Sequence, residues 1–415
     1  MEKVQLFGMP AEKGRWILIP LSITILLCLG TVYSWSIFRK PLEKLLNVGA
    51  TDSLLPFTVL LVVFAILMPI TGFYINRFDT RLITGVGGLI TALGYILSSL
   101  GGNIPTLTIT YGVIAGMGVG IAYGVPLAVV AKWFPDKKGL AVGATVIGFG
   151  LSPLITAPLA KFLIDAFGVR QTFVILGIAF AAIITAISTI LTTPPQGWQP
   201  EGWTPPVTIQ ANSHTKTSGS ILQTSGFYGL WFCYSIGSFA GLAAIGISSP
   251  LAQEIIKLDA ATAANTVSLF AVFNGAGRLF FGWFTDKFTP KLAAIVSFVL
   301  ILIASIMMLS AGKGSVLTYI VAFSLFYLAL GGWLAIAPTS TLIIFQPQDY
   351  AKNYGIVFTA YGMGALGGTL LAGKIRDIFG SYTNFFYPTA GLAIVGIILA
   401  VFTLKRNSTN ADLVT

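Results

Sequence analysis

The sequence contains few charged residues. Only 9% of its 415 residues are Asp, Glu, Lys or Arg, whereas soluble domains carry about 25%. Hydrophobic residues make up 55% of the chain, and the mean hydropathy is +0.86. These values exclude an ordinary soluble domain and predict an integral membrane protein that has the lipid bilayer as its surroundings. The apolar runs are about twenty residues long, which is the length of a membrane-spanning helix and roughly twice that of a barrel strand.

Histidine and cysteine are also scarce. The single His214 lies in a polar segment, and Cys28 and Cys233 lie in separate apolar runs. These residues suggest neither a metal site nor a disulfide framework, so we expect no cofactor and no metal. The apolar runs hold no histidine or carboxylate pair for acid–base work, so we do not expect an enzyme. The phosphate-binding motif Gly-x-x-x-x-Gly-Lys-[Ser/Thr] does not occur, which argues against ATP-driven transport by this chain.

The apolar runs predict an all-α membrane protein with twelve transmembrane helices. A proline-rich polar stretch divides the runs into six and six, and such a composition does not form a span. We therefore expect an N-terminal six-helix bundle (1–193), a cytoplasmic linker (194–226) and a C-terminal six-helix bundle (227–415). The twelve expected spans are residues 16–38, 54–75, 82–101, 105–131, 140–165, 171–192, 227–250, 262–285, 291–311, 315–345, 350–373 and 382–404.

The net charge of +10 comes mainly from Lys and Arg in the short segments between spans. Such cations set membrane orientation, so we expect no nucleic-acid partner. The loops on the side of both termini are richer in Lys and Arg than the opposite loops, to which we assign Arg39 and Lys40. The positive-inside rule then places both termini in the cytoplasm of a multi-pass protein of the cell inner (plasma) membrane.

One cation, Arg278, falls well inside an apolar run. An arginine at that depth costs about 2.5–3.5 kcal/mol on insertion scales and normally faces the bundle interior. Asn274 lies one helical turn earlier on the same face. The spans contain no obvious acidic partner, so the guanidinium is a candidate site for an anionic ligand. The alternative is an arginine bonded to backbone carbonyls of a neighbouring helix.

Internal similarity supports a duplicated architecture. Residues 72–81 and 282–291 share the pattern Gly-x-x-x-[Asn/Asp]-[Arg/Lys]-x-x-x-[Arg/Lys], about half a chain apart. Parallel six-helix repeats are a transporter architecture. Within the expected span 105–131, Gly112, Gly116, Gly120 and Gly124 recur every four residues, which predicts a face that another helix approaches closely.

The repeated loop pattern resembles that of the major facilitator superfamily. The resemblance implies two pseudo-symmetric six-helix bundles around a central cavity. In that family the loop acid caps a helix and gates the cytoplasmic side. The first copy has Asn76 in place of the acid, and the second keeps Asp286. The residues to which the resemblance gives a gating role are Asn76, Arg77, Arg81, Asp286 and Lys287.

Other stretches narrow the resemblance to the oxalate:formate antiporter family, which includes bacterial homologues of monocarboxylate transporters. They are residues 33–38, 118–124 and 132–141, the Asn353-Tyr354-Gly355 triplet and the Pro-Pro-x-Gly-Trp-x-Pro-x-Gly-Trp linker. Monocarboxylate transporter homologues carry an Asn/Asp-x-x-x-Arg pair on their eighth span. Asn274 and Arg278 match that pair.

Departures from the oxalate pattern indicate a less polar cavity. Tyr361 stands where the oxalate transporter has a second cation, a lysine. Leu330 and Leu334 stand where it has aromatic residues, and Val32 stands where it has Gln. Because one arginine compensates one carboxylate, we expect a small monocarboxylate such as lactate or pyruvate as the substrate rather than oxalate.

The expected binding site combines one charge with an aromatic and apolar wall. Arg278 would bind the carboxylate, and Asn274 and Tyr123 would supply hydrogen bonds. The remaining wall residues, for which ordinary bundle packing is the alternative, are Tyr33, Tyr361, Phe149, Leu330, Leu334 and Phe358.

We therefore expect a monomeric secondary transporter that works by alternating access. Proton-coupled symport is the favoured mode, with protons as the second partner, and carboxylate anion exchange is the alternative. A membrane sensor without transport is a remote third possibility, since the sequence shows no cytoplasmic domain through which it would act.

Overall fold

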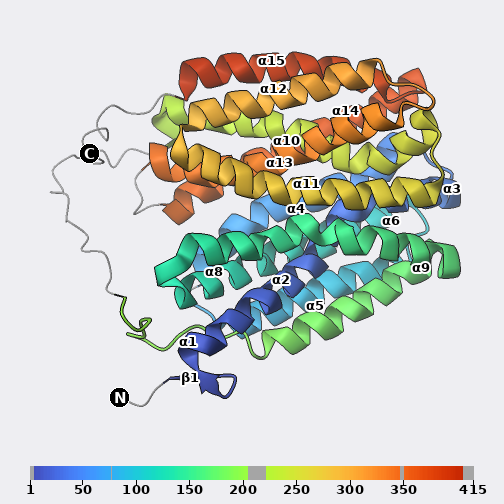
Figure 1. Ribbon diagram of the computed structural model, residues 1–415. Helices are drawn as coiled ribbons and strands as arrows, with labels where there is room; N and C mark the ends of the chain where they lie inside the picture. Colours follow the sequence, from blue (N-terminus) through green and yellow to red (C-terminus); the bar gives the residue numbers. More distant parts are fainter. Residues whose placement is uncertain (1–3, 76, 204–220, 346–349, 405–415) are drawn as a thin grey trace.

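A computed structural model describes residues 4–75, 77–203, 221–345 and 350–404. Figure 1 shows a bundle of long helices that lie along one common direction, with the blue-to-green helices below and the yellow-to-red helices above. Helix α1 begins and helix α15 ends at the same end of the bundle, which we call the terminal end. The opposite end, where α3 ends, is the distal end.

The described part of the chain before the linker forms a small hairpin and nine α-helices. The hairpin pairs β1 (Gln5–Leu6) with β2 (Met9–Pro10). The helices are α1 (Ala11–Gly14), α2 (Leu18–Leu29), α3 (Trp35–Leu46), α4 (Ala50–Tyr74), α5 (Thr80–Ser98), α6 (Ile104–Leu107), α7 (Gly116–Ala122), α8 (Gly124–Trp133) and α9 (Lys138–Ser188). Shorter 3₁₀ or π segments join them at Arg15–Ile17, Gly30–Ser34, Thr108–Ala115 and Pro135–Lys137.

The described chain after the linker forms six α-helices. They are α10 (Ser225–Leu251), α11 (Ala260–Lys287), α12 (Pro290–Leu309), α13 (Val316–Ile344), α14 (Tyr350–Phe379) and α15 (Phe386–Thr403). Short 3₁₀ or π segments occupy Ile221–Gln223, Ala252–Ile256 and Thr383–Phe385. We refer to the parts of the chain before and after the linker as the N-terminal and C-terminal halves.

Eleven stretches of the described chain are long and apolar enough to cross a membrane, so this is a multi-pass membrane protein. The sequence predicted twelve. The difference lies in one stretch, Pro135–Ser188, which spans 54 residues and contains both expected spans 140–165 and 171–192. Gly168 interrupts its helical backbone with φ 81° and ψ 165°, a conformation that favours glycine. Helix α9 therefore has two arms, and Figure 1 shows its ribbon reversing at the distal end.

Polar residues at the helix starts fix several boundaries. Asp79 Oδ1 accepts from the Arg81 N–H at the start of α5, at 2.9 Å. Asp259 Oδ1 accepts from the Ala261 and Thr262 N–H groups at the start of α11, both at 2.9 Å. Thr289 caps α12 in the same way. These side chains satisfy N–H groups that a helix cannot pair internally.

Small residues let the helices approach closely. A Cβ atom added at Gly112 or Gly116 would lie 3.0 Å from a backbone carbonyl of α4, and one added at Gly120 would lie 2.8 Å from Leu67 Cβ. The predicted close approach is thus confirmed at these three positions. It is wrong for Gly124, whose added Cβ would meet nothing within 4 Å.

The two halves pack against each other through α4 with α14 and through α9 with α11. Arg39, which we expected in an exposed loop, lies inside this packing. It belongs to α3, which continues to Leu46, and its side chain is fully buried. The helix runs past the end of the apolar stretch because the positions after Arg39 are buried on one face only, with Leu42 inside and Glu43 partly exposed.

Candidate functional site

Helix α11 carries Asn274 and Arg278 one turn apart on a buried face. Asn274 is fully buried and Arg278 is 5% exposed. The Arg278 Nε–H lies 3.4 Å from Asn274 Oδ1, and the Asn274 amide donates to the Tyr327 carbonyl of α13 at 3.3 Å. The prediction that Asn274 and Arg278 are neighbours on one face of a helix is confirmed. The amide orients the guanidinium because its own nitrogen is held by α13.

Arg278 reaches from the C-terminal half to the N-terminal half. Its Nη1 donates to the Val146 carbonyl on the first arm of α9, at 3.0 Å. Gly150 lies one turn further along α9, and an added Cβ there would be 3.0 Å from Arg278 Nε. The guanidinium therefore lies on the face of α9 that Val146 and Gly150 share. This bond is the backbone-carbonyl contact that the sequence left open as the alternative role of Arg278.

One nitrogen of the guanidinium remains without a partner. Arg278 Nη2 is buried and has no hydrogen-bond partner among the residues that the structure describes. Within the described residues, no carboxylate forms an ion pair with Arg278, whereas Arg15, Arg39 and Arg376 each pair with at least one. A buried donor without a partner is costly, and a charged one in a low dielectric attracts an anion. The carbonyl contact thus satisfies only part of this side chain.

Aromatic side chains from both halves meet at the centre of the bundle. The Tyr33 and Tyr361 hydroxyl groups lie 2.8 Å apart and link η2 (Gly30–Ser34) to α14. Phe149 packs edge-on against Tyr33 and Tyr123, with ring centroids 5.0 and 5.1 Å away. Phe358 stacks on Tyr361 at 5.1 Å. Five of the predicted wall and hydrogen-bonding residues are therefore brought together.

The contacts of this aromatic cluster do not include two predicted wall residues, Leu330 and Leu334. Leu330 is fully buried, and an added Cβ at Gly241 of α10 would lie 2.4 Å from the Leu330 Cβ, so Leu330 faces a neighbouring helix of its own half. Leu334 is half-buried and packs against the core. Ordinary packing between helices, which was the alternative to a role in the cavity wall, describes Leu330 best.

Sequence reasoning missed Phe64 and Gly150. Phe64 of α4 contacts Tyr123, Phe149, Phe358 and Tyr361, with ring centroids 5.1 to 5.9 Å apart. Nothing distinguishes Phe64 from the other apolar residues of its span. Gly150 follows Phe149 directly, and nothing in the sequence distinguishes it from the other glycines of its span.

The expected gating residues lie at the terminal end and face solvent. Arg77, Arg81, Asp286 and Lys287 are all exposed, and Asn76 lies outside the described residues. Asp286 lies in the last turn of α11, and its role as a helix cap stays a prediction. Asp79 caps α5. A pocket of about 410 Å³ at this end is lined by Asp79, Arg81 and Lys132 among others.

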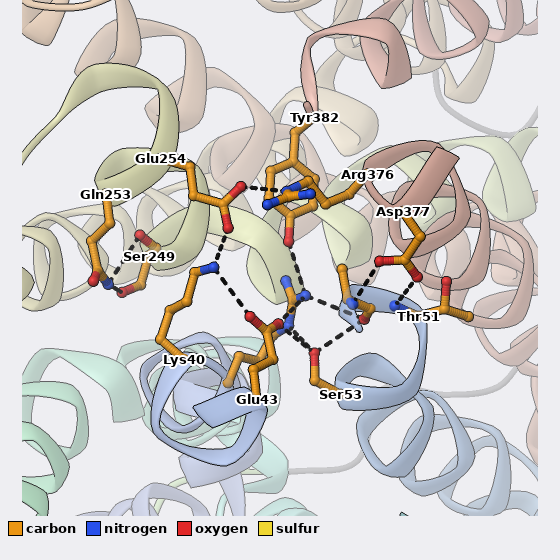
Figure 2. A network of polar contacts seen from close by, with 12 residues as sticks. Lys40, Glu43, Thr51, Ser53, Ser249, Gln253, Glu254, Arg376, Asp377 and Tyr382 are labelled. Carbon is orange, nitrogen blue, oxygen red and sulfur yellow. Dashed lines mark hydrogen bonds and ion pairs between the residues drawn. The ribbon is translucent and has the colours of Figure 1, made fainter. Parts of the chain in front are cut away.

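The distal end contains a buried network centred on Arg39. Its guanidinium donates to Ser53 Oγ at 2.9 Å and to Glu43 at 2.9 Å within the N-terminal half. It also donates to the Gly246 carbonyl at 3.1 Å and the Tyr382 hydroxyl at 2.9 Å in the C-terminal half. Figure 2 shows Glu43, Ser53 and Tyr382 coming together from separate segments of the chain. Arg39 thus joins the two halves.

Further charged groups extend this network across the halves (Figure 2). Glu254 pairs with Lys40 of the N-terminal half and with Arg376 of its own half. Asp377 accepts from the Ala50 and Thr51 N–H groups at 2.8 and 2.9 Å, so a carboxylate of α14 caps α4. We call the residues Arg39, Lys40, Glu43, Glu254, Arg376 and Asp377 the distal network.

Comparison with known proteins agrees with these features. The family model for the Major Facilitator Superfamily matches residues 20–344 and 230–414. The chain is 29% identical to the oxalate:formate antiporter of Oxalobacter formigenes, covering 95% of this chain and 92% of that protein. It is 24% identical to monocarboxylate transporter 12-B of Danio rerio, with 79% and 74% covered. The solved structure of the nucleoside transporter NupG superimposes with a TM-score of 0.73 at 12% identity, with 94% and 100% covered.

Proposed function

Because the chain belongs to the major facilitator superfamily of membrane transporters, we propose that it is a secondary active transporter of a small monocarboxylate such as lactate or pyruvate. The observation that carries this proposal is the buried guanidinium of Arg278, whose Nη2 has no hydrogen-bond partner within the described parts of the chain. The similarity to an oxalate:formate antiporter and to monocarboxylate transporters favours a carboxylate as the missing partner.

The surroundings of Arg278 favour one carboxylate over two. Tyr361, at the position where the resemblance would place a second cation, bonds to Tyr33. The aromatic rings around this pair provide apolar surface with a few hydroxyl groups. Buried charge needs compensation in a low dielectric, and Arg278 supplies one positive charge. A dicarboxylate would leave its second charge uncompensated.

A thermal-shift panel on the purified protein tests the substrate class. A ligand that binds only the folded state raises its melting temperature by mass action. Lactate, pyruvate, formate, acetate, glycolate and oxalate would be compared at equal concentration and ionic strength. We expect the largest shift from a monocarboxylate. A shift from oxalate alone would instead support a dicarboxylate carrier.

We also propose that the distal network closes one side of the carrier during alternating access. Arg39, Lys40 and Glu43 give the N-terminal half one excess positive charge, and Glu254, Arg376 and Asp377 give the C-terminal half one excess negative charge. Their pairing across the halves favours closure. With cytoplasmic termini in an inner membrane, and the halves 1–193 and 227–415 as rocking bundles, this closed side faces outward. Labelling of a cysteine introduced at Trp203 only from outside the cell would contradict that orientation.

Proton-coupled symport is the proposed coupling mode. The substrate carboxylate can carry the proton itself, since burial and neighbouring charges shift the pKa of a bound acid. In liposomes without internal substrate, an inward acid gradient should drive net uptake, and a protonophore should abolish it. Uptake that requires a preloaded carboxylate and ignores the pH gradient would identify an anion exchanger instead.

A further inference from the structure

We infer that Gly150 is a positioning residue for Arg278, because its missing side chain leaves the space in which the guanidinium lies. The inference rests on the proposed function, in which Arg278 binds the carboxylate. Gly150 belongs to the N-terminal half, whereas Arg278 and Asn274 belong to α11 of the other half. A glycine on one half thus determines where a charge from the other half is held.

The geometry around Gly150 is tighter than a side chain permits. An added Cβ would lie 2.5 Å from Asn274 Oδ1, 3.0 Å from Arg278 Nε and 3.4 Å from Arg278 Cζ. Real Cβ atoms do not approach other heavy atoms as closely as the first of these distances, so at least one side chain would have to move. The two that would move are the pair that forms the candidate anion site.

Asn274 has little freedom to move away. It is fully buried, and its amide nitrogen is held by the Tyr327 carbonyl. The backbone at Asn274 is also confined, since an added Cβ at Gly331 of α13 would lie 2.0 Å from the Asn274 carbonyl oxygen. Moving Arg278 alone would not relieve the 2.5 Å contact with Asn274 Oδ1, so this oxygen or α11 itself must shift. Either movement disturbs the Arg278 Nε contact with Oδ1 and the Nη1 bond to Val146, and it moves Nη2 from its present position.

Gly150→Ala should therefore weaken carboxylate binding on the order of tenfold, because a misplaced donor loses much of its hydrogen-bond energy. The matched control is Gly143→Ala on the same arm of α9. An added Cβ at Gly143 meets nothing within 4 Å, and the change in helix propensity is the same. L-lactate and pyruvate binding would be measured by isothermal titration calorimetry on both purified variants and the wild type.

A second measurement reports the position of Arg278 without any substrate. Phenylglyoxal modifies exposed arginines, and mass spectrometry gives the rate at each site. We expect Arg278 to react faster in Gly150→Ala than in Gly143→Ala or the wild type. Arg39 is buried in the distal network, and its rate should stay unchanged if the bundle remains folded. A rise at both arginines would indicate general loosening and overturn the positioning role.

The outcomes separate this inference from the proposed function. If the wild type binds an acid and Gly150→Ala binds it as Gly143→Ala does, the inference is wrong and the function stands. If the wild type binds neither acid, the function fails for these ligands, and Arg278 reactivity alone decides the inference. Equal rates in the two variants would overturn it.

A double variant covers the case in which Gly150→Ala does not fold. Asn274→Ser removes the oxygen nearest to the new methyl group, so Gly150→Ala/Asn274→Ser has more room than Gly150→Ala. Its contact with Arg278 Nε remains. We expect Arg278 to react faster with phenylglyoxal in the double variant than in Asn274→Ser. Equal rates would overturn the positioning role.

Discussion

At the residue scale, the sequence located the charge of the candidate site but not all of its contacts. Asn274 and Arg278 could be paired because the helical repeat places positions four apart on one face. The hydroxyl bond between Tyr33 and Tyr361 could not be predicted, since these residues are 328 positions apart and neither helix alone indicates its rotation. Leu330 was assigned to the wall by resemblance, and the structure shows it against Gly241 instead.

The bond between the Tyr33 and Tyr361 hydroxyl groups gives a prediction for stability. Both side chains are buried, so Tyr33→Phe or Tyr361→Phe leaves the other hydroxyl without this partner. Each single variant should lose about 1–3 kcal/mol of unfolding free energy. Tyr33→Phe/Tyr361→Phe should lose less than the sum, because both polar partners are then removed. Chemical denaturation in detergent would measure these values, and additive losses would argue against the bond.

At the element scale, the sequence predicted the spans well, and the short gap between the spans 140–165 and 171–192 contains Gly168, where α9 turns. The two arms of α9 follow so closely around Gly168 that one stretch contains both spans. Arg39 shows a different difficulty, because the sequence placed the end of its helix too early. A cation after an apolar run normally marks a loop, but α3 continues to Leu46, and Arg39 is buried because Glu43, Ser53 and Tyr382 all bond to it. Those partners come from three separate segments.

The start of α11 gives a prediction for pH dependence. Hydrogen bonds from Thr262 and Ala261 hold the pKa of Asp259 below its usual value. A lowered pKa in the folded state means that the carboxylate stabilises the fold above the unfolded pKa of about 3.9, and this stabilisation is lost as the pH falls through the folded value. Asp259→Ala should lower the melting temperature at neutral pH, and the difference from wild type should shrink in acid. A difference that does not depend on pH would contradict this role.

The cap that Asp377 places on α4 gives a prediction for conformational balance. Asp377→Asn should weaken distal closure by about 1 kcal/mol, because it removes a negative charge from a helix N-terminus. In a variant without Cys28 and Cys233, a cysteine introduced at the buried Leu54 would report opening, since Leu54 lies against Gly246 of the other half. We expect its reaction with an impermeant maleimide to be roughly fivefold faster.

Asp165→Asn is the matched control for this experiment. Asp165 also belongs to the distal end, but it pairs with Lys161 of its own helix and is largely exposed. Its loss should leave the labelling rate unchanged. Equal acceleration by both variants would show a general charge effect and not a contact between the halves.

At the scale of the whole molecule, the repeated loop pattern indicated the family and the apolar runs indicated a multi-pass membrane protein, whereas neither indicated how the two halves contact each other. Span count and repeat depend on local composition. The interface depends on which side chains oppose each other after folding, as with Arg278 on the Val146 carbonyl and Asp377 on the Ala50 N–H. Both contacts join residues more than one hundred positions apart, so no local pattern indicates them.

The central claim is that Arg278 binds the transported carboxylate, and substrate uptake into proteoliposomes tests it most directly. Wild type, Arg278→Lys and the exposed control Arg170→Lys would be reconstituted at equal density and given labelled L-lactate or pyruvate. We expect Arg170→Lys to match the wild type. Arg278→Lys should lose about 2 kcal/mol of binding, or roughly thirtyfold in uptake at low substrate, because lysine lacks the planar fork of donors. Uptake by Arg278→Lys at the wild-type rate would contradict the assignment.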